Sequence, residues 1–349
     1  MNMNEDIALN PLELRNFNKK INAIFENKIN KKIEILIVPK LLDVTANQKN
    51  VAIVLDEKLI LKILSNYFEN VIITEINNKN DLEKLAIRKP DLVFSGVKFF
   101  YFDKNIIWLN DFLETFAIPY IASSRLALEN EGDKKLAKKI MKKNNIQTAD
   151  YFTTEPGEHN DEKSIPIKFP LFIKPISGGD SRGIDKNSVV HNFLNFQFKV
   201  EDIKNKQNLR SLVEAYLPGK EYSVGIFQNN LNGNLTAMPI EIIVQKNLNG
   251  NCIIDYDIKK NDIENVIAVK DKKIYNLLSK ISKKAFKALD GKSFGRIDIK
   301  MDNFGKPHFI EANLMPGLKK GYFYRSCVLN LNISYEQMIL RIVNNALFI

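Results

Sequence analysis

Cysteine and histidine are scarce in this chain, which has two cysteines and three histidines among 349 residues. Cys252 and Cys327 lie far apart, and no CxxC or mixed Cys/His spacing occurs. This scarcity argues against a disulfide-stabilised scaffold and against a zinc site. Free cysteines are typical of a reducing compartment, so we expect a cytoplasmic protein.

Long apolar runs are also missing. No stretch approaches the ~18 consecutive apolar residues that a membrane-spanning helix needs. The N-terminal stretch MNMNEDIALN is polar and has no signal-peptide core. We therefore expect no membrane association.

The net charge of +10 comes from lysines that are spread along the whole chain and mixed with asparagine and isoleucine. No basic stripe with interleaved aromatic residues and no nucleic-acid-binding motif is present, so we expect no nucleic-acid partner. A nucleic-acid-binding protein is the alternative, and salt-dependent retention of the protein on DNA would support it. The charge does favour anionic substrates such as a nucleotide.

Two regions of different character follow one another along the chain. Up to about residue 128, short apolar strands alternate with helices, which predicts a parallel-sheet α/β unit. The strands are expected at 33–39, 51–55, 71–76 and 91–96, and the helices at 56–69 and 110–118. An amphipathic helix is expected before them over 11–30, and a basic helix after them over 130–145.

From about residue 150, short strands with hairpin turns dominate, which indicates a mixed α+β region, and a helix is expected over 272–290. We therefore predict an N-terminal helical extension (1–30), an α/β domain (31–128) and a C-terminal domain (129–349). The C-terminal domain should contain two subdomains, 129–212 and 213–349. A chain of this length is expected to divide in this way.

The stretch GRIDIKMDNFGKPHFIEANLMPG, residues 295–317, predicts a hairpin with a functional polar face. A four-residue loop at 303–306 would place Asp298 opposite Glu311 and Arg296 opposite Asn313. Opposed carboxylates repel each other unless a cation lies between them. Because Ile297, Ile299 and Ile310 are expected on the buried face, the polar face is free for chemistry.

The hairpin's oxygen donors suit magnesium or manganese, since Asp298, Glu311 and Asn313 offer hard ligands with no nearby histidine or cysteine. The alternative is a solvated strand face with a chance charge pair.

A second candidate site is the stretch FPLFIKPISGGDSRGI, in which Lys174 ends an apolar strand before a glycine-rich loop at 178–183. Glycines allow backbone N–H groups to approach an anion, although such a loop is often only a turn. The loop lacks GxxxxGK[ST], so it is not a Walker A motif. A lysine that emerges from a buried strand needs a partner for its charge, and a phosphate would supply one.

Four further charged residues are weaker candidates. Glu214 and Glu221 flank a Pro-Gly turn, where an acid could accept ribose hydroxyls and the backbone at 214–217 could pair with an adenine edge. Lys134 begins a basic helix, and Lys259 lies in the stretch DYDIKK. Taken alone, the two glutamates are better explained as exposed surface charges, and a surface charge is also the alternative for the two lysines.

Together, these stretches resemble the ATP-grasp ligases of the D-alanine–D-alanine ligase branch. The residues that carry the resemblance run in order as GDKKLAKKIM, PLFIKPISGGDSRGI, LVEAYLPGKEYSVGIF, DYDIKK, GRIDIKMD and FIEANLMPG. The resemblance covers about residues 90–345. It implies an α/β domain followed by two subdomains that hold ATP between antiparallel sheets. It also implies an ADP-forming reaction that joins a carboxylate, through an acyl phosphate, to an amine, and a homodimer.

The resemblance implies roles for individual residues. For ATP it implies Lys134, Lys174, Ser181, Glu214, Ala215, Tyr216, Leu217 and Glu221. For magnesium or manganese it implies Asp298, Glu311 and Asn313, and for catalysis Arg296, Lys259 and Gly317. Lys259 would close over the terminal phosphate, and Arg296 and Gly317 would face the oxyanion.

The chain departs from this family where amino-acid substrates would bind. The usual early Gly-Gly-x-Ser-x-Glu motif is missing, Asp180 replaces a serine of the glycine-rich loop, and LKKGYF follows the Pro-Gly of the hairpin. We therefore expect an acceptor pocket built from Asp180, Lys320 and Tyr322, with a substrate other than D-alanine alone. The alternatives are a D-alanine–D-alanine ligase proper and a non-catalytic ATP-binding relative.

Overall fold

The computed structural model describes residues 28–37, 53, 55–102, 105–178, 181–229, 232–245, 250, 253–254 and 263–347. Most of the expected helix 11–30 and of the expected strand 51–55 lies outside these ranges. The end of that helix is wrong, because Ile29 and Asn30 already belong to strand β1 (Ile29–Ile37). None of the helices in the described ranges has the length and apolar composition needed to cross a bilayer.

The N-terminal region is built on a parallel sheet with the order β2-β1-β3. It contains β1, β2 (Phe68–Glu75) and β3 (Leu92–Ser95), with the crossover helices α2 (Glu57–Ser65) and α3 (Lys79–Arg88). Parallel neighbours need such crossovers because a tight turn cannot join them. The predicted α/β unit is therefore confirmed. A small hairpin of β4 (Phe99–Phe102) and β5 (Asn105–Trp108) follows, and then α4 (Leu109–Thr115).

Two helices stand where one was expected over 130–145. They are α5 (Arg125–Gly132) and α6 (Lys134–Lys143). Asp133 separates them, since its backbone is extended and its carboxylate accepts from the N–H groups of Lys135 and Leu136. This N-cap starts a new helix with Lys134 in its first turn.

The second sheet is antiparallel, with the order β6-β9-β7-β8, and α7 (Phe193–Gln207) packs on it. Its strands are β6 (Tyr151–Thr154), β7 (Leu171–Pro175), β8 (Val189–Val190) and β9 (Ser211–Ala215), and the 3-10 turn η2 (Glu162–Ser164) lies between β6 and β7. The predicted subdomain boundary at 212 falls inside β9. Because β9 pairs with both β6 and β7, this sheet extends to Ala215.

The third sheet has five antiparallel strands in the order β12-β11-β10-β13-β14. They are β10 (Glu221–Gln228), β11 (Leu235–Ile243), β12 (Asn265–Ala268), β13 (Phe294–Met301) and β14 (Pro307–Asn313). Helix α9 (Lys272–Ala288) covers one face, where Gly295 lies against Phe286. Helix α10 (Tyr322–Leu331) covers part of the other face, where Gly225 lies against Ser326.

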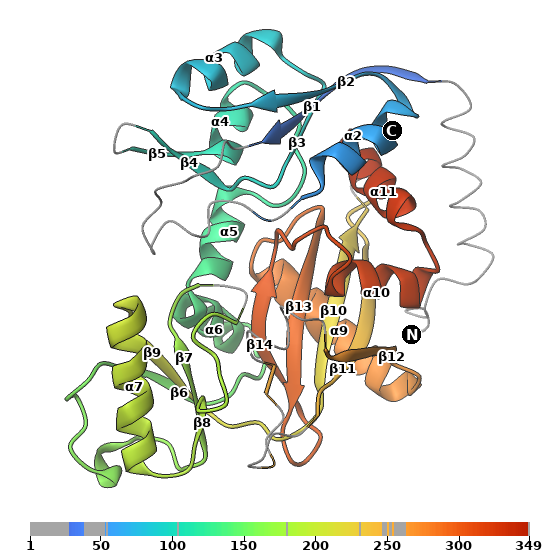
Figure 1. The fold of residues 1–349 in the computed structure, drawn as a ribbon. Helices are drawn as coiled ribbons and strands as arrows, with labels where there is room; N and C mark the ends of the chain where they lie inside the picture. Colours follow the sequence, from blue (N-terminus) through green and yellow to red (C-terminus); the bar gives the residue numbers. More distant parts are fainter. Residues whose placement is uncertain are drawn as a thin grey trace.

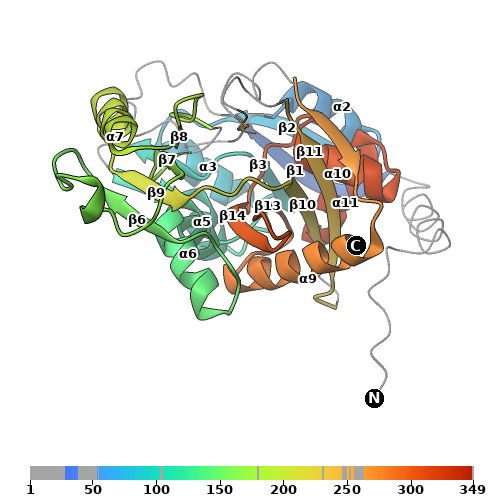
Figure 2. The ribbon, with the colours of Figure 1, turned by 90° about the horizontal axis from the view of Figure 1, so that it is seen from below.

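The three sheets are arranged around helices α5 and α6, as Figure 1 shows. The second sheet, with α7, lies beside the third sheet, and both are seen side by side in Figure 2. The C-terminal helix α11 (Tyr335–Leu347) returns to pack against α2 and β3 of the N-terminal region. The second and third sheets therefore face a common space, and this space contains the site described next.

Candidate active site

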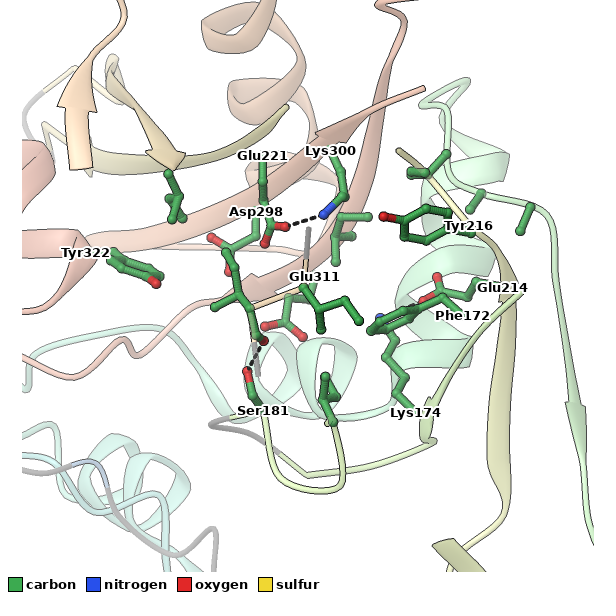
Figure 3. A pocket seen from close by; sticks show the side chains of 18 residues that line it. Phe172, Lys174, Ser181, Glu214, Tyr216, Glu221, Asp298, Lys300, Glu311 and Tyr322 are labelled. Atoms are coloured by element: carbon green, nitrogen blue, oxygen red, sulfur yellow. Dashed lines mark hydrogen bonds and ion pairs between the residues drawn. The ribbon is translucent and has the colours of Figure 1, made fainter. Parts of the chain in front are cut away.

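A cavity lies between the second and third sheets (Figure 3). Its empty volume, including its open mouth, is about 750 Å³. Ten of the predicted site residues line it: Lys174, Ser181, Glu214, Ala215, Tyr216, Leu217, Glu221, Asp298, Glu311 and Tyr322. They come from strands β7, β9, β10, β13 and β14, from the segments after β7 and β9, and from helix α10. Residues far apart in the sequence are therefore brought together here.

The predicted hairpin register is confirmed at the site, where Asp298 pairs with Glu311 and Arg296 with Asn313. The predicted loop is wrong by one residue. Asp302 and Lys306 already pair through their backbones, which leaves a three-residue loop whose Gly305 has a positive φ of 74°. A β-bulge compensates for the shorter loop, because Ile299 pairs with Phe309 and Ile310 is left as the extra residue.

The bulge also changes the role of Ile310. This residue was expected on the buried face of the hairpin, but it lines the cavity instead. Phe309 takes the buried position and is fully buried.

Asp298 is held from two sides within the protein. It accepts a 2.6 Å hydrogen bond from the Ser223 hydroxyl and a bidentate pair of 3.0 Å bonds from the Arg296 guanidinium. Burial lowers the pKa of Arg296, but the nearby Asp298 and Glu311 outweigh it, so that this pKa is raised. Arg296 therefore stays cationic beside the two opposed carboxylates.

The predicted metal ligands lie on the two paired strands of the hairpin, with Asp298 opposite Glu311 and Asn313 opposite Arg296. The Asp298 and Glu311 side chains both border the cavity (Figure 3). Asn313 is not among the residues that line it, and only its amide oxygen could contact a cation. Within the described ranges, no group of three or more His, Cys, Asp or Glu residues could hold a metal. Two carboxylates and one amide nevertheless suit a hard cation that keeps water or phosphate oxygens as further ligands, as Mg²⁺ does. The residues present fit such an ion.

A buried ion triad forms the side of the cavity next to the second sheet. It consists of Lys138, Glu214 and Lys174. The Glu214 carboxylate makes an ion pair through one oxygen with Lys138 and through the other, at 2.7 Å, with Lys174. Burial raises the pKa of Glu214, but the two lysines outweigh it and hold this pKa at about 2. Lys174 is also buried, yet Glu214 and Glu311 raise its pKa. Lys174 therefore presents a permanent positive charge in the cavity.

We expect Glu214 to make protein stability depend on pH in the acidic range. Its pKa falls from 4.5 to about 2 on folding, so the ionised carboxylate stabilises the fold above pH 4.5 by on the order of 3 kcal/mol. This contribution is lost as the pH falls from 4.5 to 2. Thermal unfolding should show that Glu214→Gln is much less stable than wild type at pH 7. The gap should close towards pH 2, and a gap that stays constant would contradict the assignment.

Glu221 forms an ion pair that the sequence analysis did not predict. Lys300 lies opposite it on β13, donates to it at 2.7 Å and also lines the cavity. The alternation along β13 could have revealed Lys300, because residues 296, 298 and 300 share one face.

The apolar walls of the cavity were also missed. They consist of Ala149, Phe172, Ile184, Ile242, Ile253, Ile254 and Ile310. Phe172 shares a strand face with Lys174 and could have been inferred from the same alternation. A hydrogen bond of 3.1 Å from the Ser181 hydroxyl to the Ile254 carbonyl connects the loop after β7 to this wall.

Several predicted residues lie outside the cavity lining. Lys134 donates a 2.5 Å hydrogen bond to the carbonyl of Gly178, so it lies at the start of the glycine-rich loop. Gly317 and Lys320 are exposed. Asp180 and Lys259 lie outside the described residues. The roles of these residues stay predictions.

Tyr322 is the predicted substrate residue that the structure brings to the cavity. Its ring is buried and lies 5.4 Å from the Arg296 guanidinium carbon, within cation–π range. Burial raises its pKa, and Glu264 adds to the shift. The phenol is therefore neutral and presents a flat wall close to Asp298.

Comparison with known proteins identifies the family to which this chain is similar. Residues 140–344 match the family model described as D-ala D-ala ligase C-terminus. A D-alanine–D-alanine ligase of Aquifex aeolicus is 31% identical over 239 residues, which cover 67% of this chain and 75% of that protein. D-alanine–D-alanine ligase B of Clostridium perfringens is 29% identical over 247 residues, with 68% and 74% covered.

Solved structures with the same fold include the Bacillus anthracis D-alanine–D-alanine ligase complexed with ATP. Its TM-score is 0.65 at 21% identity, with 91% of this chain and 98% of that chain covered. The VanG D-Ala:D-Ser ligase of Enterococcus faecalis has a TM-score of 0.63 at 18% identity, with 91% and 100% covered.

The architecture is thus the ATP-grasp fold, with an α/β domain before it, as the sequence predicted. The chain belongs to the D-alanine–D-alanine ligase-like family, because the family model covers more than half of it.

Proposed function

We propose that this chain is an ADP-forming ligase that uses ATP and magnesium or manganese to join a carboxylate to an amine. One observation carries this proposal. A single cavity brings together a buried cationic lysine, Lys174, and two opposed carboxylates, Asp298 and Glu311, with Arg296 beside them. Such a combination suits a polyanionic nucleotide with its divalent cation.

The reaction proposed here has two steps. The terminal phosphoryl group of ATP passes to a substrate carboxylate, which releases ADP and leaves an acyl phosphate. An amine then attacks the acyl carbon, phosphate leaves, and the amine loses a proton. Phosphoryl transfer of this kind depends on positioning and on neutralising the charge that develops.

The chain's own residues supply most of that environment. Lys174 would bind a phosphate oxygen, and its pairing with Glu214 fixes its direction. Asp298, Glu311 and Asn313 would hold the metal, which supplies charge neutralisation at the phosphates when bound. Arg296 would stabilise the oxyanion, and the apolar walls would keep water away from the reactive acyl phosphate.

The nucleoside would bind against the segment after β9. The residues at 214–217 line the cavity and can present their backbone to an adenine edge. Glu221 can accept ribose hydroxyls, and its pair with Lys300 neutralises a carboxylate that would otherwise repel the phosphates.

The substrate pair is proposed to be an amino acid or dipeptide other than two D-alanines. The support comes from Tyr322, a large aromatic ring against the cavity in the segment that follows Pro316-Gly317. Asp180 and Lys320 belong to the same proposed acceptor pocket. A D-alanine–D-alanine ligase proper is the second candidate, favoured by the names of the relatives.

A coupled ADP-release assay on the purified protein, screened over amino acids, dipeptides and hydroxy acids, tests the substrate proposal. We expect D-alanine alone to be a poor substrate and a larger or more anionic partner to be used at least about tenfold more efficiently, which is the discrimination that a reshaped pocket supplies. Replacing the ring by Tyr322→Ser should shift the preference towards smaller amines. Efficient D-alanyl-D-alanine synthesis with no gain from any other pair would overturn the substrate proposal and leave the ligase proposal standing.

A non-catalytic ATP-binding relative is the alternative in another class. It would bind ATP but release no ADP with any substrate pair. The retention of Arg296 beside the opposed carboxylates argues against it, because nucleotide binding alone does not need an oxyanion partner.

The proposal also includes the domain limits 31–128 and 129–349, a homodimer and a cytoplasmic location. Size-exclusion chromatography with light scattering would test the oligomeric state.

A further inference from the structure

Lys138 is a fully buried lysine that does not line the cavity. It lies on α6 and contacts the carboxylate of Glu214 on β9. Its ammonium also donates a 2.6 Å hydrogen bond to the hydroxyl of Thr148. The Thr148 hydroxyl in turn donates, at 3.1 Å, to the carbonyl of Phe309 on β14.

This chain of contacts joins the two sheets that enclose the cavity. Glu214 belongs to the second sheet, whereas Phe309 belongs to the third, two residues before Glu311. Thr148 and Phe309 also form a backbone bridge, and the Phe309 N–H donates to the Gln147 carbonyl at 2.8 Å. Lys138 is thus the charged link between the strand that orients Lys174 and the strand that carries Glu311.

Burying an ammonium group is costly unless its partners compensate. Lys138 lies outside the cavity lining, so its charge serves Glu214. Glu214 uses one oxygen for Lys138 and the other for Lys174. Without Lys138, the buried carboxylate would have a single cationic partner and no fixed direction. Lys174 would then be drawn fully onto Glu214 and away from an incoming anion.

We propose that Lys138 is a positioning residue. Through Glu214 it holds Lys174 towards the phosphate groups of the nucleotide, and through Thr148 it keeps Lys174 in register with the hairpin of Asp298 and Glu311. This inference rests on the proposed nucleotide binding. It assigns to Lys138 a role in phosphate recognition without contact to the ligand.

The test compares ATP with adenosine as ligands in calorimetric titrations of the purified protein with Mg²⁺. Lys138→Met should weaken ATP binding by at least about tenfold, because Lys174 would no longer be held towards the phosphates. This is the usual effect of losing one charge-assisted contact, here the contact of Lys174. Adenosine affinity should change by less than about twofold, because Lys138 contacts the Glu214 side chain, whereas the adenine is proposed to pair with the backbone at 214–217. A general loss of structure would weaken both ligands alike, so the ratio of the two affinities separates positioning from folding.

A matched control is available in the same region. Lys199 on α7 is equally buried and forms a 2.9 Å ion pair with Asp185. Unlike Glu214, its partners Asp185 and Asp202 do not line the cavity. Lys199→Met should lower the melting temperature and leave the ratio of ATP to adenosine affinity unchanged.

Thr148→Val keeps the charges of the triad and removes the side-chain hydrogen bonds to Lys138 and Phe309, while the backbone bridge to Phe309 remains. It therefore serves as the test if Lys138→Met does not fold. Thr148→Val should lower the ratio of ATP affinity to adenosine affinity by a smaller factor than Lys138→Met does. An unchanged ratio in both Lys138→Met and Thr148→Val would overturn the inference. Absence of ATP binding to the wild-type protein would instead overturn the proposed function.

Discussion

Asp298→Asn and Glu311→Gln should each reduce ADP-forming turnover by about 10³-fold or more, while the fold stays intact. Each change removes one charged metal ligand from the cavity face of the hairpin. Glu311→Gln relieves the repulsion between the opposed carboxylates, so its melting temperature should not fall. Asp298→Asn also removes the charge that pairs with Arg296, so its melting temperature should fall while the protein still folds. Initial rates with saturating ATP and metal would measure the effect.

Metal binding gives a second measurement that does not depend on activity. Electron paramagnetic resonance titration with Mn²⁺ should show at least tenfold weaker binding in either variant, consistent with the loss of one carboxylate ligand. Glu241→Gln on β11 is the control, since Glu241 pairs with Lys220 and lies outside the cavity lining. Near wild-type turnover in both Asp298→Asn and Glu311→Gln would refute the metal site.

Lys174→Met should lower kcat/KM for ATP by about 10²-fold, as expected when one preorganised cationic donor is removed. The methionine keeps the length of the side chain but leaves Glu214 with Lys138 as its remaining cation in the triad. The wild-type triad carries a net positive charge, whereas the remaining pair of Glu214 and Lys138 is neutral. Steady-state kinetics over a range of ATP concentrations would measure this change.

Glu221→Gln is the milder comparison, because Glu221 lies at the proposed ribose position and its partner Lys300 remains. We expect an increase of KM for ATP of less than about tenfold with little change in kcat, which is the pattern of lost uniform binding. Unchanged ATP titrations in both Lys174→Met and Glu221→Gln would mean that the nucleotide does not bind in this cavity.

The hairpin shows how far local pattern reasoning reaches. Strand alternation placed Asp298 and Glu311 opposite each other, and the structure confirms the pair. The loop length was nevertheless wrong by one residue, and the bulge at Ile310 compensates for it. Turn residues predict that a chain reverses, but whether a bulge absorbs one residue depends on packing against the neighbouring elements.

The buried charges show what local reasoning cannot reach. Lys138 reads in the sequence as one of several lysines on a basic helix, and nothing local distinguishes it from the exposed Lys139. Its burial depends on Glu214 and Thr148, which come from other parts of the chain.

By itself, the sequence determined the α/β start of the chain, the opposed carboxylates of the hairpin and the order of motifs that indicates an ATP-grasp ligase. The first two features depend on residue periodicity within one segment, which is a local property. The ATP-grasp ligase was indicated by the resemblance of six motifs along the chain to that family. Only the tertiary structure decided which residues share the cavity. It also decided that Lys138 and Lys174 each pair with one oxygen of the Glu214 carboxylate, and that Lys300 neutralises Glu221. Those outcomes depend on the packing of two sheets against each other, because burial of a charge is decided by partners distant in the sequence.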